Sequence, residues 1–200
     1  MKPVQIGIIG LGTVGAGTVN LLKENAEEIT RRAGRQINIR AVAVNDIAKQ
    51  RACEISEFQL TDDPFEVTDD PQIDLIVELV GGESTAREVV LRALEHGKHV
   101  VTANKALIAI HGNEIFDVAL GKGLVVAFEA AVAGGISIIK VLREGLAGNR
   151  IERVIGISER IAFKFLIHSI EVQFSALESA SKTFQFFFQF FNCIIYVIFA

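Results

Sequence analysis

The sequence predicts an α/β fold in which helices cover both faces of a doubly wound parallel sheet. The first observation is that short apolar runs alternate with segments of helical periodicity through residues 4–147. This alternation specifies parallel strands joined by right-handed crossovers. The second observation is a glycine-rich turn directly after the first apolar run. The third is a change of composition near residue 157, which predicts a truncated or aberrant C-terminal segment.

The first two strands are expected at residues 4–9 (VQIGII) and 37–44 (INIRAVAV), because both are short apolar runs typical of buried parallel strands. A helix is expected between them, and its pattern fades in the polar stretch 23–35. Its apolar side is formed by Val14, Val19, Leu21 and Leu22. Asn45 and Asp46 end the second strand.

Two Asp-Asp-Pro turns, at residues 62–64 and 69–71, flank a short amphipathic piece. A third strand is expected at 73–80 (IDLIVELV). Thr85 and Glu88 have the spacing of a capping box, which predicts that a helix begins there. The buried face of that helix is expected to comprise Ala86, Val89, Val90, Ala93 and Leu94, and Gly97 should end it.

Further elements follow in the same alternation. We expect a strand at 99–102, a helix at 104–120 broken at Gly112, a strand at 124–128 and a helix at 136–147. Residues 151–157 begin a strand for which the sequence offers no evident partner.

Composition excludes several functions. Half of the residues are hydrophobic, so a large core can form, and the net charge of −4 with no basic stripe argues against nucleic acid as a partner. Cys53 and Cys193 lie far apart and form no CxxC pair, which indicates neither a zinc site nor a disulfide framework. Glycines interrupt the N-terminal apolar run, so it does not resemble a signal peptide, and we expect a cytoplasmic protein.

The glycine-rich turn, GLGTVG at residues 10–15, has the GxGxxG spacing of a dinucleotide-binding loop. It follows a strand and opens a helix, which is the context in which this motif is informative. Gly10 would allow the tight turn, Gly12 a close approach of the pyrophosphate, and Gly15 close packing of helix on strand. A plain glycine turn is the weaker alternative. We therefore expect a Rossmann-type dinucleotide-binding domain over residues 1–150.

The choice between NAD and NADP stays open at the end of the second strand. An acidic residue there would hold the ribose 2′-hydroxyl, and the position falls on Asn45 or Asp46. Arg40, Lys49 and Arg51 are near enough in sequence to meet a 2′-phosphate, which slightly favours NADP. All of these residues could equally be ordinary solvated surface residues.

Four segments together resemble homoserine dehydrogenase, and the resemblance runs from Met1 to Gly156. They are IGIIGLGTVG (6–15), DLIVELVGG (74–82), GKHVVTANKALIAIHG (97–112) and FEAAVAGGISIIK (128–140). The resemblance implies NAD(P)-dependent interconversion of L-aspartate 4-semialdehyde and L-homoserine in threonine and methionine biosynthesis. For the family it also implies a homo-oligomer. A different dehydrogenase with the same cofactor half is disfavoured, because the TANK and EAAVAGG segments occur together.

The resemblance also implies residue roles. Thr13 and Val14 would touch the dinucleotide through the loop backbone, and Gly81 and Gly82 would lie beneath it. Lys105 would lie at the cofactor and the substrate, where a cation could polarise a carbonyl as hydride arrives. The alternative for Lys105 is a surface lysine, although a helix start is an unfavourable place for a cation.

A monovalent cation, such as sodium, is a second implication of the resemblance. The family's cation site would correspond to Glu129, Val132, Gly134 and Ile136, which would supply one carboxylate and backbone carbonyls. Hard oxygen ligands suit such an ion. The alternative is a glutamate that caps a helix beside a glycine turn.

The last part of the chain differs from the rest. All 17 glycines precede residue 157, whereas the run 184–199 is rich in phenylalanine and has no glycine, proline or charge. A membrane anchor is one interpretation, but polar residues interrupt this run and it is shorter than the roughly 20 apolar residues of a span. A core segment is a second, and a non-native end such as a frameshift or truncation is the favoured one.

Residues 151–200 are expected to hold the start of a substrate domain followed by this atypical phenylalanine-rich tail. The family continues after Gly156 with an Asn-Gly-Thr segment and a domain that holds acidic residues and a second lysine, whereas this chain has Ser158, Glu159 and Arg160. We therefore expect a chain that binds a nucleotide but shows little or no turnover of the small-molecule substrate. The alternative is a non-catalytic nucleotide-binding fragment that associates with a full-length relative.

Overall fold

A computed structural model describes residues 2–132, 137–151, 153–156 and 171–174. Its main body is a six-stranded sheet in the order β3-β2-β1-β4-β5-β6, and every neighbouring pair is parallel. The strands are β1 (Val4–Ile9), β2 (Ile37–Ala43), β3 (Gln59–Thr61), β4 (Leu75–Glu78), β5 (His99–Thr102) and β6 (Val126–Ala127). The predicted parallel α/β sheet is thus confirmed.

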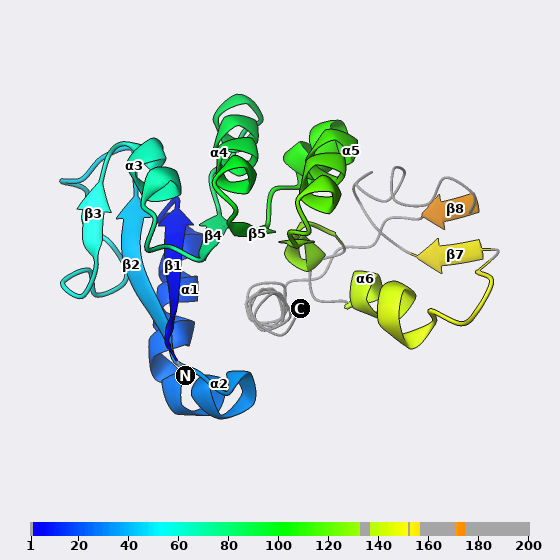
Figure 1. Ribbon diagram of the computed structural model, residues 1–200, viewed down its shortest axis with the longest axis horizontal. Helices are drawn as coiled ribbons and strands as arrows, with labels where there is room; N and C mark the ends of the chain where they lie inside the picture. Colours follow the sequence, from blue (N-terminus) through cyan, green and yellow to red (C-terminus); the bar gives the residue numbers. More distant parts are fainter. Residues whose placement is uncertain (1, 133–136, 152, 157–170, 175–200) are drawn as a thin grey trace.

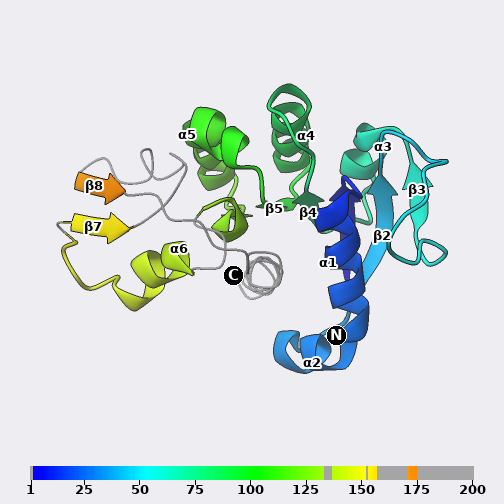
Figure 2. The same ribbon diagram turned by 180° about the vertical axis from the view of Figure 1, so that it is seen from behind.

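Helices cover both faces of this sheet, as Figures 1 and 2 show from opposite sides. One face carries α1 (Thr13–Glu24) and α2 (Ala26–Ala33). The other carries α3 (Pro64–Asp69), α4 (Ser84–Glu95) and α5 (Lys105–Gly121). The chain therefore reverses its direction of winding between β1 and β4, and ligands of open parallel sheets bind at such a switch point.

Two apolar cores lie on the two faces, because successive side chains of a strand point to opposite sides. Ile6 and Ile8 of β1 pack with Val19 and Leu22 of α1. On the other face, residues of β4 and β5 pack against α3, α4 and α5. The five predicted buried residues of α4 are all at most 1% exposed. A third, smaller cluster joins Ile108, Phe128 and Ile139.

Several predicted elements are corrected by the structure. The helix at 104–120 is not broken at Gly112, since α5 runs through it without interruption. The capping box of Thr85 and Glu88 is wrong, because α4 begins at Ser84 and no side chain caps it. The predicted strands 73–80 and 124–128 are shorter, and α2 and β3 were not predicted as separate elements.

The C-terminal elements also differ from the prediction. The short 3-10 turn η1 (Glu129–Ala131) is followed by α6 (Ile138–Lys140) and by the π-helical segment η2 (Val141–Gly145) in place of one helix at 136–147. β7 (Arg153–Gly156) does have a partner, because it pairs in parallel with β8 (Glu171–Phe174). The phenylalanine-rich run 184–199 lies outside the described residues. Among the residues that are described, no helix is long and apolar enough to cross a membrane.

Candidate functional site

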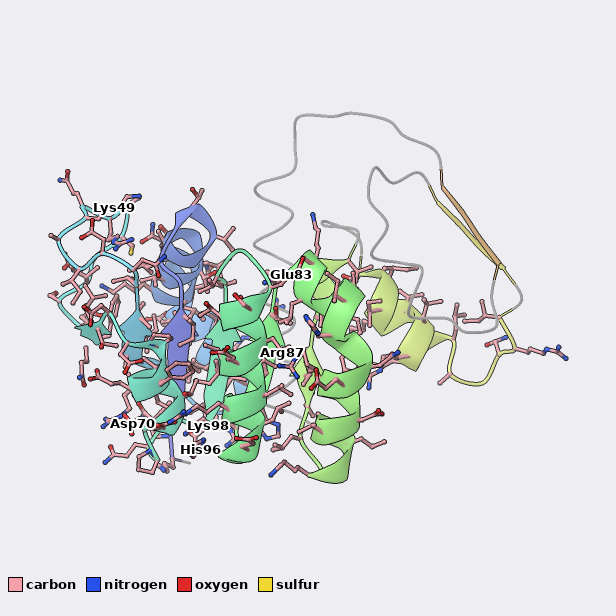
Figure 3. All side chains as sticks on the ribbon, turned by 90° about the horizontal axis from the view of Figure 1, so that it is seen from above. Lys49, Asp70, Glu83, Arg87, His96 and Lys98 are labelled. Carbon is pink, nitrogen blue, oxygen red and sulfur yellow. The ribbon has the colours of Figure 1, made fainter. Side chains whose placement is uncertain are left out.

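The candidate site lies at the carboxyl edge of the sheet, where the turns after β1, β4 and β5 come together. Backbone hydrogen bonds join these turns: the Leu79 amide donates to the Ile9 carbonyl at 2.8 Å, and the Ala103 amide donates to the Glu78 carbonyl at 3.3 Å. Figure 3 shows Lys49 and Glu83 on one side of the domain and Asp70, His96 and Lys98 on the opposite side. Glu83 directly precedes α4, so its side is that of the carboxyl edge.

The glycine loop has the geometry that its spacing predicts. Gly10 has a φ of +99°, and a Cβ at this position would lie 2.9 Å from the Leu79 carbonyl carbon and oxygen. A Cβ on Gly15 would lie 2.3 Å from the Gly10 oxygen. Gly12, by contrast, is exposed and a Cβ there would meet nothing within 4 Å. Gly10 and Gly15 are therefore required by the packing of the loop, whereas Gly12 leaves the loop backbone accessible to a ligand.

The first turn of α1 is open to an anion. The helix begins at Thr13, Gly12 is its N-cap, and no side chain caps the amide groups. Thr13 is exposed and Val14 is half-buried. Because uncapped N–H groups and the helix dipole both favour negative charge, this end of α1 is suited to a pyrophosphate.

The turn after β4 supplies a second open stretch. Gly81 and Gly82 are both exposed, a Cβ added to either would meet nothing within 4 Å, and Gly82 has a φ of +97°. The Asn104 side-chain amide donates to the Gly82 carbonyl at 2.7 Å and to the Val80 carbonyl at 3.1 Å. This turn is therefore held in place by the turn after β5.

Glu78, at the end of β4, is a buried carboxylate that the sequence analysis did not single out. It accepts hydrogen bonds from the Thr102 hydroxyl at 2.5 Å and from the Val80 amide at 2.8 Å. Burial raises the pKa of Glu78 to about 7, against the opposing effect of these hydrogen bonds. The available signal was a second acidic residue near the end of the run IDLIVELV, after the apolar residues Leu75, Ile76 and Val77.

Lys105 is the first residue of α5 and is exposed. The Asn104 side chain caps this helix by accepting from the Leu107 amide at 3.1 Å. Within the described ranges the Lys105 ammonium has no hydrogen-bond or ion-pair partner, so its charge is available to a ligand. An unpaired cation at a helix N-terminus is electrostatically unfavourable. Lys105 therefore does not stabilise α5, and its position agrees with a role in binding a ligand.

The end of β2 brings together only some of the residues that were predicted to contact the ribose or its 2′-phosphate. Asn45 and Lys49 are exposed. Arg51 joins two loops, because its guanidinium donates to the Leu11 carbonyl at 3.1 Å and to the Asp46 carbonyl. Arg40 instead pairs with Asp70, with 2.6 Å between Nε and Oδ2. Asp70 lies on the side away from Lys49, so Arg40 is a poor candidate for a 2′-phosphate ligand (Figure 3).

Glu129 occupies a place that fits the capping alternative. Its carboxylate accepts from the amides of Ile139 and Lys140, both at 2.9 Å, and burial raises its pKa. Val132 is buried beside it, and Gly134 and Ile136 lie outside the described residues. In the part of the chain that the structure describes, no three acidic, histidine or cysteine side chains are grouped to hold a metal ion.

A groove of about 600 Å³ lies away from these turns. It is lined mainly by α1, by β2 and by β3 with the loop that precedes it, including Leu22, Ile37 and Phe58. Neither the glycine loop nor Lys105 borders it, so its location does not coincide with the predicted site.

Comparisons with known proteins agree with this arrangement. A family model described as the NAD-binding domain of homoserine dehydrogenase matches residues 10–129. Homoserine dehydrogenase of Pseudomonas aeruginosa is 58% identical over 157 residues, which cover 78% of this chain and 36% of that protein. The Neisseria gonorrhoeae enzyme is 54% identical over 158 residues, with the same two coverages.

Solved structures give the same result. A homoserine dehydrogenase from Thiobacillus denitrificans matches with a TM-score of 0.72 and 59% identity, over 76% of this chain and 35% of that one. A Staphylococcus aureus homoserine dehydrogenase matches with a TM-score of 0.64 and 41% identity, over 68% and 34%. The chain thus spans about a third of the length of the relatives it matches. It belongs to the homoserine dehydrogenase family, with the NAD-binding domain of that family as its matched part.

Proposed function

We propose that this chain binds a nicotinamide dinucleotide across the carboxyl edge of β1, β4 and β5. We also propose that the complete protein interconverts L-homoserine and L-aspartate 4-semialdehyde. The observation that supports this most is the unobstructed surface around the switch point. Gly12, Gly81 and Gly82 are open, and Lys105 beside them has no partner among the described residues.

Each of these groups has a definite task in the proposal. The free amides at the start of α1 would hold the pyrophosphate, with Thr13 and Val14 contributing their backbone, while Gly10 and Gly15 fix the loop. Bound NAD(P)H supplies the hydride. The Lys105 ammonium would stabilise the negative charge that develops on the aldehyde oxygen, which then takes up a proton to give the alcohol.

The preference between the two cofactors would be set at the end of β2. We favour NADP slightly, because Lys49 and Arg51 can offer positive charge to a 2′-phosphate, whereas Asn45 is neutral. Arg51 already anchors the adjacent loops, so Lys49 is the freer of the two. Equal dissociation constants for NADH and NADPH, unchanged in Lys49→Ala, would remove this preference.

Turnover is a separate expectation. The matched region corresponds to about 36% of the relatives' length. A reduction needs a proton donor and a formed substrate pocket as well as a hydride. We therefore expect the 200-residue chain, assayed alone, to bind NADPH and to oxidise it with aspartate semialdehyde at a negligible rate. An ordinary enzymatic rate for the purified chain would refute this expectation.

Self-association of the complete protein, which the family resemblance implies, is a further part of the proposal.

A bound monovalent cation is another part of the proposal, and it can be tested on this chain. Sodium would be held by the Glu129 carboxylate and the carbonyls of Val132, Gly134 and Ile136. The Glu129 oxygens each accept one amide, which leaves a lone pair on each for an ion. We expect the melting temperature to fall when sodium is replaced by choline at constant ionic strength. The absence of any such change would exclude the cation.

The nucleotide site is tested most simply at Gly12. Gly12→Ala adds a methyl group where the free chain has open space and a φ of −77°, so the folded chain should tolerate it. A bound pyrophosphate would meet that methyl group. We expect the dissociation constant for NADPH, measured by fluorescence, to rise at least tenfold with an unchanged melting temperature.

The matched control is Gly121→Ala, because Gly121 is also exposed and also faces open space, at the far end of α5. This variant should bind NADPH as the unchanged chain does. If Gly12→Ala binds equally well, the loop does not contact the pyrophosphate and the proposed site is wrong.

A further inference from the structure

The Glu78 side chain has properties that the fold alone does not require. It ends a strand whose other residues, Leu75, Ile76 and Val77, are apolar, and it is 0% exposed. Among the described residues, no lysine or arginine forms an ion pair with it. Burying a carboxylate without a cation destabilises a fold, and an apolar residue of similar size would avoid that cost. The contacts of Glu78 therefore have to account for a buried carboxylate at this position.

The two contacts of Glu78 belong to different turns. One carboxylate oxygen accepts the Val80 amide in the turn after β4, and the other accepts the Thr102 hydroxyl at the end of β5. The Glu78 backbone carbonyl adds a third link by accepting from the Ala103 amide. Glu78 therefore ties both turns to the end of one central strand.

Asn104 closes this set of contacts. Its amide N–H donates to the Thr102 hydroxyl oxygen at 3.0 Å, and its side chain donates to the carbonyls of Val80 and Gly82. We call Glu78, Thr102, Asn104 and the main chain of Val80 and Gly82 the edge network. Every link of this closed network is a hydrogen bond, and closed networks hold geometry more firmly than isolated pairs do.

Lys105 immediately follows the edge network along the chain. Asn104 is both the last member of the network and the N-cap of α5, of which Lys105 is the first residue. The backbone that carries Lys105 is thus fixed on one side by Glu78 through Thr102. On the other side, Gly82 is fixed by Asn104, and it belongs to the second turn of the proposed nucleotide site.

We propose that Glu78 is a positioning residue that holds the Lys105 turn and the Gly81–Gly82 turn in the geometry needed for the dinucleotide. This inference rests on the proposed function, because it assigns a task to the same site. A buried group that supports the residues in contact with a ligand is a general requirement of precise sites. Glu78 itself touches neither cofactor nor substrate in this account.

Three substitutions separate positioning from simple stability. Glu78→Gln keeps an acceptor for the Val80 amide and can donate to the Thr102 oxygen, so the edge network can persist. Glu78→Leu removes both side-chain bonds, and Thr102→Val removes the hydroxyl bond to Glu78 together with the oxygen that accepts from the Asn104 amide. The matched control is Thr68→Val, because Thr68 is also 0% exposed and loses the contacts of its hydroxyl with the Phe65 carbonyl and the Asp69 carboxylate, both in α3.

Two readouts are taken on the full chain. The first is hydrogen exchange of the Asn104 and Leu107 amides without nucleotide, and the second is the dissociation constant for NADPH. We expect Glu78→Leu to accelerate exchange at both amides at least tenfold. Thr102→Val removes the acceptor of the Asn104 amide itself, so for this variant the informative amide is Leu107, whose exchange should also rise at least tenfold. Both variants should weaken NADPH binding at least tenfold. Glu78→Gln should stay within threefold of the unchanged chain in both. Thr68→Val should lower the melting temperature without changing either readout.

The outcomes distinguish the two proposals. If the unchanged chain binds neither NADPH nor NADH, the proposed function fails, and hydrogen exchange still decides whether Glu78 positions the turn. If the chain binds NADPH but Thr102→Val changes neither the exchange of the Leu107 amide nor the affinity, the positioning role of Glu78 is refuted. Should Glu78→Leu not fold, Thr102→Val and Glu78→Gln give the same decision.

Discussion

At the scale of single residues, the three glycines of the GxGxxG loop have separable roles. Gly10 and Gly15 are required by the loop itself, because a side chain on either would collide with backbone atoms. Gly12 has no such neighbour, so the packing of the free chain does not require a glycine at this position. A motif that looks uniform in sequence therefore combines two positions that the packing of the loop requires with one position that is open to the proposed ligand.

The structural role predicts a large effect for Gly15→Ala. Its Cβ would lie 2.3 Å from the Gly10 oxygen, and neither atom belongs to a flexible side chain. We expect the free energy of unfolding to fall by about 3 kcal/mol, as for strong overpacking. Urea denaturation measures this change, with Gly12→Ala as the control that should lose little. Equal stabilities of the two variants would contradict the packing argument.

The buried carboxylate of Glu78 predicts a dependence of stability on pH. Its pKa in the folded chain is about 7, above the ordinary value of 4.5. Between these values the folded chain holds a proton that the unfolded chain releases, so stability falls as pH rises through this interval. In Glu78→Gln this fall should be absent. The stability of the variant relative to the unchanged chain should increase by roughly 3 kcal/mol from pH 4.5 to above pH 7.

Urea denaturation of both proteins at several pH values checks this result. Taking the difference between the two proteins cancels the titration of all the other groups that they share. A difference that stays constant with pH would show that Glu78 is not buried as a titrating carboxylate.

Sequence reasoning identified the candidate residues that belong to a local motif and missed those whose contacts come from distant parts of the chain. The glycine loop was predictable because its spacing is local, with Gly15 packed against the oxygen of Gly10 five residues earlier. Glu78 was missed because its partner Thr102 lies 24 residues away. Arg40 was wrongly included, since only the fold brings it to Asp70, 30 residues away. The role of Lys105 at the cofactor stays a prediction.

At the scale of elements, helix starts are determined by particular side chains. Asp63 caps α3 by accepting from the Phe65 amide at 2.8 Å, and Pro64 occupies its first turn. Asn104 caps α5 in the same way but also donates to two carbonyls of the turn after β4. The two caps therefore differ in how far their effects extend.

This difference predicts unequal costs for two similar substitutions. Asp63→Ala removes a cap and should lower the free energy of unfolding by about 1 kcal/mol. Asn104→Ala removes a cap and two further hydrogen bonds, so we expect a loss of about 2 kcal/mol. Thermal or urea denaturation compares them directly. If Asp63→Ala is the more damaging change, the edge network adds nothing to the cap.

The errors in predicting elements have physical causes. Gly112 was expected to break α5, but a glycine inside a helix costs only about 1 kcal/mol, and the buried packing of the helix outweighs this. It lies against Phe116, whose ring would be 3.3 Å from an added Cβ. α2 was missed because its sequence is mostly polar, and only Ile29 and Ala33 are buried. β3 is only three residues long.

At the scale of the whole molecule, the order of the strands explains why the site lies where it does. The sheet reverses its winding between β1 and β4, so helices leave in opposite directions and the turns on either side leave a free edge. The groove lined by α1, β2 and β3 is a different surface. We therefore propose that a dinucleotide binds at this edge and not in that groove.

Mapping the bound nucleotide by backbone amide chemical shifts tests this claim most directly. On titration with NADPH, we predict that the perturbed amides will lie in the turns at residues 10–15, 81–82 and 102–105, together with Asn45. Amides around Leu22, Ile37 and Phe58 in the groove should not shift. Perturbations confined to the groove, or none at saturating NADPH, would contradict the assignment of this edge as the nucleotide site.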